Sequence, residues 1–306
     1  MKDSVEVVPG NPAASLLYAE VGEALKQLTS ARPISDEAIH EARKSLKKAR
    51  AALRLLRDGM DDAAYGRENA KLRDAGRLLT PLRDAKSLME ALDSLQKQYA
   101  GKLTDDTLAP LHKILHANLA RARRHFHPGP ARESAELNNC FKLIQNSLAT
   151  AKRLKLRSIE PAHIRPGLRR IYWKGRKARA EAMSDPTTEK LHEWRKQVKY
   201  LFNASDVLSS KESNGNGIKK MLKRADRLAD LLGGDHELAM LAHEIDREDR
   251  ASASADAAMT KTLHQFINRR RAKLQKRAFK SGTKLYDQKP RQFAKRACAR
   301  ICTASC

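Results

Sequence analysis

The chain has 306 residues, of which 61 are Lys or Arg and 36 are Asp or Glu, giving a formal net charge of +25. Hydrophobic residues make up 41% of the sequence, whereas Gly and Pro are sparse at 14 and 11, which favours long helices over a protein of strands and turns. So large a positive charge attracts polyanions, and the candidate partners are nucleic acid, an acidic membrane surface or a condensed phosphate polymer.

We expect neither a signal peptide nor a membrane-spanning segment. The N-terminal stretch MKDSVEVVPGNPAA has no apolar core of signal-peptide length, and no run approaches the length of a membrane span. Cys298, Cys302 and Cys306 lie at steps of four near the C-terminus, while Cys140 stands alone. We therefore expect a cytoplasmic protein with reduced thiols and without membrane insertion.

Helical periodicity runs through almost the whole chain. The predicted helices, in chain order, cover 12–30, 36–57, 62–79, 84–100, 104–126, 132–153, 161–184, 187–209, 216–232, 235–249, 256–282 and 290–301. Breaks are expected at HPGP (127–130), SNGNG (213–217) and the Gly pair 233–234. No alternating strand segment of useful length is present, so the expected fold class is all-α.

The sequence repeats itself. The segment IHEARKSLKKARAALRLLR at 39–57 aligns with LHEWRKQVKYLFNASDVL at 191–208, and LLTPLRDAKSL at 78–88 aligns with LLGGDHELAML at 231–241. Two matches in the same order predict an internal duplication. We expect two helical bundles of about four to six helices each, at 12–155 and 156–301, with short tails at 1–11 and 302–306.

The first repeated segment places a basic residue directly after each apolar position of its helical seam. The basic residues are His40, Arg43, Lys47, Arg50, Arg54 and Arg57. Positions that step by three and four share one stripe of a helix, so these side chains form a second stripe beside the buried one. No acid occurs between residues 42 and 57, although like charges at this spacing cost ~0.2–0.5 kcal/mol per pair. The pattern predicts a counter-ion supplied from outside.

The second repeat carries a shorter basic stripe. Its predicted seam is Leu191, Trp194, Val198 and Leu201, its bases are His192, Arg195 and Lys199, and Phe202 occupies the next position. We expect other helices to complete the stripe, with Arg169, Arg170, Lys174 and Arg176 from one segment and Arg270, Arg277 and Lys284 from another.

Several of these residues also have a purely structural interpretation. Lys and Arg beside an apolar seam can cover it with their methylene groups. His40 and His192 could pack between helices or donate to phosphate. Arg83-Asp84 and His236-Glu237 are most simply explained as buried ion pairs or helix-end supports, with a role in orienting the basic stripe as the alternative. Trp173 and Trp194 are expected in the core.

The sequence offers binding groups without a recognisable catalytic constellation. His112 and His116 are spaced to chelate a metal, but no third ligand accompanies them. A glycine-rich phosphate loop, an HExxH motif and a carboxylate cluster suited to Mg²⁺ are all missing from the sequence. We expect a protein that is not an enzyme and that holds no metal or cofactor.

The repeated segments resemble the signatures of the CHAD domain, a family of all-helical proteins named for conserved histidines. IHEARKSLKKARAALRLLR resembles the first signature, and LHEWRKQVKYL, preceded by SDPTTEK, resembles the second. PLRDAKSLMEAL, LGGDHELAML and the late stretch RRRAKLQKRAF resemble further landmarks of the family. The likeness extends over roughly 12–300, so we expect a stand-alone member without an appended catalytic domain.

The resemblance implies two bundles related by a pseudo-twofold axis, with their basic stripes facing a shared groove or cavity. It also implies binding of inorganic polyphosphate and, in bacteria, location at polyphosphate granules. The anion ligands carried over by motif position are His40, Arg43, Lys44, Lys47, Arg50, His192, Arg195, Lys196 and Lys199. Phe202 stands where the family often has a further base, which makes the two halves of the site unequal.

Three functions follow from these observations. The first is non-enzymatic binding of inorganic polyphosphate through the basic helix faces. The second is nucleic-acid binding, which the low aromatic content of 5% disfavours for single strands. The third, less favoured, is a metal-dependent phosphatase or kinase. The sequence does not indicate an oligomeric state.

Overall fold

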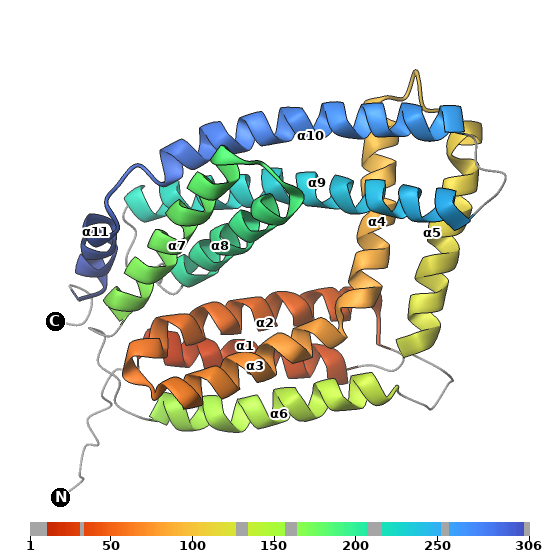
Figure 1. Ribbon diagram of the computed structural model, residues 1–306. Helices are drawn as coiled ribbons and strands as arrows, with labels where there is room; N and C mark the ends of the chain where they lie inside the picture. Colours follow the sequence, from red (N-terminus) through yellow and green to blue (C-terminus); the bar gives the residue numbers. More distant parts are fainter. Residues whose placement is uncertain are drawn as a thin grey trace, which may run out of the picture.

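The computed structural model describes residues 11–30, 34–126, 134–156, 164–206, 216–251 and 257–302. Within these ranges the backbone forms α-helices, a short 3-10 turn at Arg57–Gly59 and no strand, so the all-α prediction is confirmed (Figure 1). The helices are α1 (Pro12–Thr29), α2 (Asp36–Leu56), α3 (Asp62–Leu78), α4 (Thr80–Gln98), α5 (Asp105–Phe126), α6 (Ala135–Leu156), α7 (Ile164–Ser184), α8 (Thr188–Asp206), α9 (Asn216–Ala251), α10 (Ala257–Leu285) and α11 (Pro290–Cys302).

Side-chain caps explain why the helices begin where they do. The hydroxyl of Ser35 accepts a hydrogen bond from the backbone N–H of Ala38 at the start of α2. The carboxylate of Asp61 does the same for Ala64 at the start of α3. Such caps satisfy N–H groups that have no partner inside the helix and stabilise it by about 1 kcal/mol. The predicted starts of both helices are confirmed.

The predicted break at the Gly pair 233–234 is wrong, because α9 continues through it from Asn216 to Ala251. A Cβ atom at Gly233 would lie 3.5 Å from the Nε atom of Arg195, and one at Gly234 would lie 3.3 Å from Leu274. The contact would be an ordinary van der Waals distance at Gly233 and a tighter one at Gly234, so it is Gly234 that lets α10 approach α9 closely. This packing function is hard to distinguish in a sequence from a helix end.

The other predicted breaks fall largely outside the described residues. This applies to HPGP at 127–130, to positions 213–215 of SNGNG, and to 157–160 of the expected connection between the repeats. It also applies to residues 1–10 and 303–306 of the expected tails. The division into bundles at 155/156 stays a prediction.

The helices pack in two groups that α4 and α5 bring together (Figure 1). Helices α1, α2, α3 and α6 contact one another on one side, and α7, α8, α9 and α10 do so on the other, with α11 against α7. Helices α4 and α5 run across the molecule to α9 and α10. There, the rings of Tyr99 and Phe266 lie 4.4 Å apart, and Asn118 donates to Glu244 over 2.7 Å.

Helix α2 lies at the centre of these contacts, since it packs against α1, α3, α4, α7 and α8. The predicted seam is confirmed: its buried members are Ile39, Ala42, Leu46, Ala49, Leu53 and Leu56. Ala51, Ala52 and Leu55 are buried as well, so the packed surface of α2 widens toward its C-terminal end. The basic stripe follows the border of this surface, where α2 meets α8.

The two tryptophans differ in their surroundings. Trp194 is fully buried on the seam of α8, where its ring stacks on Phe279 at 5.3 Å, as predicted. Trp173 is 50% exposed, so the prediction that it lies in the core is wrong. The neighbouring Tyr172 occupies the core position instead. Its ring stacks on Phe293 at 4.0 Å, and its hydroxyl donates to the carbonyl of Leu285.

The contact between α7 and α2 can be tested at Gly167. A Cβ atom there would lie 2.9 Å from the backbone Cα and O atoms of Leu55. We expect Gly167→Ala to lower the free energy of unfolding by at least about 1–3 kcal/mol, because the two helices would have to separate. Chemical denaturation measures this change.

The matched control is Gly66→Ala in α3, where nothing lies within 4 Å of the added Cβ atom. Helix propensity alone should make this variant more stable by up to about 1 kcal/mol. Equal stability changes for the two variants would show that α7 does not approach α2 as closely as described.

Candidate functional site

Lys47 on α2 lies among four other cationic side chains that come from three helices. They are Arg43 from α2, Arg83 from α4, and Arg195 and Lys199 from α8, and we call the five residues the Lys47 cluster. Burial is the largest cause, and repulsion by the four neighbours the second, of a pKa of Lys47 lowered to about 7. The fold therefore brings the basic stripes of the two repeats into one electrostatic unit.

Lys47 combines two properties that seldom occur together. Its side chain is exposed to solvent, yet protein atoms surround it closely enough that desolvation is the main influence on its pKa. An ammonium in this position can be reached by an anion from outside. This is a favourable electrostatic environment for binding an anion.

Arg43 is held by two hydrogen bonds, and both Arg43 and Arg195 keep unused donor capacity. Nη1 of Arg43 donates to the carbonyl of Gly76 over 2.6 Å and to the hydroxyl of Thr80 over 2.5 Å. Nε of Arg43 and Nε of Arg195 are buried without a hydrogen-bond partner among the described residues. Burial lowers the pKa of both guanidinium groups, although both stay charged at any physiological pH.

His192 and His236 form a pair beside the Lys47 cluster. Their ring centroids lie 4.3 Å apart, and Nδ1 of each ring is buried without a hydrogen-bond partner among the described residues. Burial, followed by the charge of Arg195, lowers the pKa of His192. Burial and the proximity of His192 lower the pKa of His236 to about 4. Both imidazoles are therefore neutral near pH 7 in the unliganded protein.

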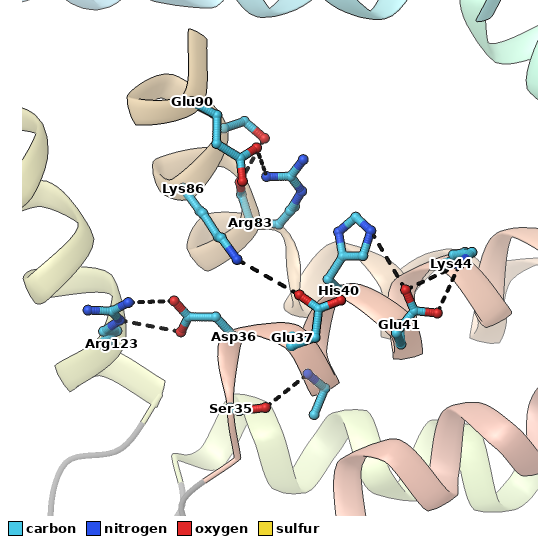
Figure 2. A network of polar contacts seen from close by, with 12 residues as sticks. Ser35, Asp36, Glu37, His40, Glu41, Lys44, Arg83, Lys86, Glu90 and Arg123 are labelled. Atoms are coloured by element: carbon cyan, nitrogen blue, oxygen red, sulfur yellow. Dashed lines mark hydrogen bonds and ion pairs between the residues drawn. The ribbon is translucent and has the colours of Figure 1, made fainter. Parts of the chain in front are cut away.

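Figure 2 shows the polar network around the first turns of α2, which includes His40. Nε2 of His40 lies 4.0 Å from the carboxylate of Glu41, and the same carboxylate accepts from Nζ of Lys44 at 3.0 Å. Burial and the charge of Arg83 lower the pKa of His40. His40 thus lies at the α4 side of the Lys47 cluster and gains no strong internal partner that would hold its proton.

Two carboxylates, Asp84 on α4 and Glu237 on α9, lie close to the cluster. Burial is the main cause of a raised pKa in both, and it outweighs the attraction of nearby arginines, among them Arg83 and Arg195. The ion pair expected between Arg83 and Asp84 does not form, because Arg83 pairs with Glu90 at 2.8 Å. Neither carboxylate forms an ion pair within 4.0 Å among the described residues, so Asp84 and Glu237 compensate the cluster only in part. They correspond to each other in the two repeats, which is the signal by which sequence analysis could have placed them here.

The C-terminal part of the basic stripe of α2 extends away from Lys47. The guanidinium of Arg54 stacks on the ring of Tyr200 at 3.8 Å and donates to the carbonyl of Arg50. Lys174 of α7 lies near Arg54, and burial together with this positive neighbour lowers the pKa of Lys174. Sequence analysis missed Tyr200, because nothing in a linear pattern indicates which aromatic ring will support an arginine from another helix.

Four of the predicted Lys and Arg ligands already have carboxylate partners inside the protein. Lys44 pairs with Glu41, Lys196 pairs with Glu193, and Arg170 pairs with Asp58. In the Lys47 cluster itself, the ammonium of Lys199 lies 3.9 Å from the carboxylate of Asp226. The expectation that the basic stripes lack internal counter-ions is therefore wrong for these four side chains. Lys44 and Lys196 occupy corresponding positions of the two repeats, and each is paired with the Glu three residues before it.

The remaining predicted ligands lie apart from Lys47. Arg270 borders a cavity of about 160 Å³ between α4 and α9 that Glu90, Asp230 and Glu237 also line. Arg169 is exposed on the outer side of α7, and Arg277 is exposed on α10. Arg176 donates to the carbonyl of Gln288. A single stripe joining these residues to the cluster is not observed.

No group of three or more His, Cys, Asp or Glu side chains in the described part of the chain could hold a metal ion. None of its helices combines the length and hydropathy that a membrane span requires. Cys140 is a buried free thiol, and burial raises its pKa to about 12.

Fold and site together define an all-helical protein in which two groups of helices bring cationic side chains to a common centre. A family model for the CHAD domain matches residues 19–246 of the sequence. The chain therefore belongs to the CHAD domain family, and the resemblance noted in its repeats is confirmed.

Solved structures support this assignment at the level of the fold. The crystal structure of the CHAD domain from the plant Ricinus communis superimposes with a TM-score of 0.57 at 15% identity, covering 97% of this chain and 95% of that one. PptA from Streptomyces chartreusis gives a TM-score of 0.54 at 14% identity, covering 92% of this chain and 100% of that one. No curated protein matches significantly.

The partial compensation by Asp84 leads to a testable expectation. Asp84→Asn removes a negative charge that repels incoming anions, while the amide keeps the shape of the side chain. We expect the affinity for tripolyphosphate, measured by isothermal titration calorimetry, to rise about tenfold, since one close like-charge contact opposes binding by about 1 kcal/mol or more.

Asp93→Asn is the matched control, because Asp93 lies on the same helix, is about half exposed and is 4.0 Å from His112 rather than near the cluster. Its effect on tripolyphosphate affinity should be within twofold. Equal effects of the two substitutions would mean that only net charge matters and that Asp84 has no local influence.

Proposed function

We propose that this protein binds inorganic polyphosphate at the Lys47 cluster and does not process it chemically. The observation that supports this most directly is the convergence of Arg43, Arg83, Arg195 and Lys199 on an exposed Lys47. The fold holds these charges together against their mutual repulsion. A ligand with many closely spaced negative charges would relieve the repulsion and release its own condensed counterions, which drives binding at low salt.

The chemistry of the cluster favours polyphosphate over nucleic acid. Polyphosphate carries a charge on every phosphate with no sugar or base between, so its charge density suits four cations gathered around one lysine. Two aromatic rings near the cluster already face cations of the protein: Tyr200 supports Arg54, and the ring of Phe202 lies 5.4 Å from the ammonium of Lys199. Membership of the CHAD domain family agrees with a polyanion as the ligand.

The proposal includes a groove between the two repeats, which are related by an approximate twofold axis. In support, the corresponding helices α2 and α8 contact each other, and so do α4 and α9, as a twofold arrangement requires. Equivalent contacts also recur within the halves, since α2 packs against α1 and α4, and α8 packs against α7 and α9. The exposed but closely surrounded Lys47 would lie at the bottom of the groove.

The biological setting follows as part of the same proposal. A protein that binds polyphosphate without consuming it would gather on cytoplasmic polyphosphate granules, where it could organise the polymer or recruit other proteins. Nucleic acid would then compete for the cluster only through its phosphates, and with lower affinity at equal phosphate concentration.

The site is tested by reversing one charge from each repeat. We expect Lys47→Glu combined with Lys199→Glu to weaken binding of long-chain polyphosphate at least about 100-fold, because each lost contact to a charged group is worth about 1.5–3 kcal/mol. The slope of log affinity against log salt should also become shallower by about 2. Filter binding or fluorescence anisotropy over a range of salt concentrations measures both quantities.

Lys113→Glu combined with Lys142→Glu is the matched control, since both lysines are exposed on other helices and the change in net charge is the same. If the control double variant lost as much affinity as the cluster variant, the binding would be non-specific. Phosphate release with Mg²⁺ or Mn²⁺ present, abolished by substitution of His40 or His192, would contradict the proposal that the protein is not an enzyme.

Binding should take up protons because the pKa of Lys47 is low in the free protein. A bound polyanion stabilises the ammonium and raises its pKa, so the affinity should fall as the pH rises through about 7. Calorimetry at pH 7.5 in two buffers of different ionisation enthalpy should show uptake of a substantial fraction of one proton per site.

Lys47→Arg distinguishes proton uptake by Lys47 from proton uptake by the histidines, because a guanidinium stays charged over the whole pH range of the experiment. This variant should bind at pH 6 much as the parent does and should lose most of the proton uptake at pH 7.5. An undiminished uptake would assign the titration to His40 and His192, whose pKa values are also lowered in the free protein.

A further inference from the structure

Trp173 is the most exposed large aromatic side chain of the described residues, and the proposed polyphosphate site makes no use of it. Half of its surface is accessible to solvent, although Tyr172 beside it is fully buried. The buried face of α7 is formed by residues such as Ile164, Leu168 and Ile171, and Trp173 lies on the opposite side. A single exposed hydrophobic side chain is common on protein surfaces, so the charged residues around Trp173 carry the argument for a contact surface here.

The surroundings of Trp173 are strongly cationic. Helix α7 carries seven Lys and Arg residues and a single acid, Glu181. Four of the cations stand one turn before or after the tryptophan: Arg169, Arg170, Arg176 and Lys177. The ammonium of Lys177 lies 5.8 Å from the centre of the indole ring and 3.7 Å from Glu181. Arg169 is exposed and extends this patch by one turn.

The combination of an indole ring with flanking cations narrows the choice of ligand. Polyphosphate has no ring and would gain nothing from Trp173. A membrane surface requires a broad apolar face, but the apolar face of α7 is packed in the core. An acidic peptide would use the cations and not the ring. Single-stranded nucleic acid uses both, because its bases stack on aromatic side chains while its phosphates contact Lys and Arg.

We propose that the outer face of α7 binds single-stranded nucleic acid, with a base stacked on Trp173 and neighbouring phosphates on Arg169 and Lys177. The patch connects with the basic stripe of α2 through Lys174, which lies near Arg54. A strand leaving the patch therefore finds further cations in that direction. This second site differs in chemistry from the Lys47 cluster, since its ligand is recognised by a base as well as by charge.

The test compares oligonucleotides with and without bases. An abasic oligodeoxynucleotide presents the same phosphates as oligo(dA) of equal length but cannot stack. We expect the protein to bind oligo(dA) about tenfold more tightly, because stacking of one base on one aromatic side chain contributes an amount of this order. Trp173→Ala should abolish the difference, and Trp173→Phe should retain most of it.

The fluorescence of the protein reports directly on the site, because Trp194 is fully buried and Trp173 is half exposed. Oligo(dA) should quench the emission of Trp173, whereas the abasic strand and polyglutamate should not. Met183→Ala is the matched control on the same helix, since Met183 is 53% exposed. Its preference for oligo(dA) should equal that of the parent.

Three results would overturn the proposal: equal affinity for oligo(dA) and the abasic strand, a base preference that persists in Trp173→Ala, or quenching by polyglutamate as strong as that by oligo(dA). The last would identify an acidic protein segment as the partner. Trp173→Ala should leave polyphosphate binding unchanged, and the Lys47→Glu, Lys199→Glu variant should keep its preference for bases, so the two sites can fail independently.

Discussion

The structure depends on holding like charges together. Lys47 lies among four cations, and its lowered pKa shows that the folded protein disfavours its proton. Between pH 7 and 10.5 the unfolded chain therefore binds more protons at this lysine, so the unliganded fold gains stability as the pH rises through that window. Below pH 7 the full penalty is present. A bound polyanion removes it, so ligand and fold stabilise each other.

The packing of apolar side chains between helices opposes this repulsion, and α2 contributes to it through contacts with five other helices. Its C-terminal half is buried against several neighbours, with Leu53, Leu55 and Leu56 fully inaccessible. Burial of a leucine side chain stabilises a fold by about 1.5–3 kcal/mol, which exceeds the cost of one like-charge contact on a helix surface. The close approaches of Gly167 to α2 and of Gly234 to α10 help to fix where α7 and α9 lie. The core therefore determines how near the cations come to one another.

The fold class and the central part of the site could be predicted from the sequence, because both follow from periodicity. Apolar residues at steps of three and four identified the buried faces, and the bases beside them identified Lys47 and Arg195. How closely two helices pack in the folded protein leaves no such periodic pattern in the sequence. The Gly pair 233–234 was therefore mistaken for a helix end. Trp173 was placed in the core because a helix pattern does not decide which of two adjacent aromatics faces inward, and Tyr172 takes that place by bonding to Leu285.

Some carboxylates near the basic stripes lie at the protein surface and others are largely buried. This difference affects which anions can bind. Glu41 and Glu193 pair with Lys44 and Lys196 at the surface, so the outer cations are already compensated. Asp84 and Glu237 lie deeper, where burial raises their pKa although nearby arginines attract them. Two cations of the Lys47 cluster also have carboxylate partners, Lys199 with Asp226 and Arg83 with Glu90. The site therefore holds negative as well as positive charge at both depths. A small anion would meet the internal carboxylates with few charges of its own, whereas a polymer can contact several cations at once and offset that repulsion along its length.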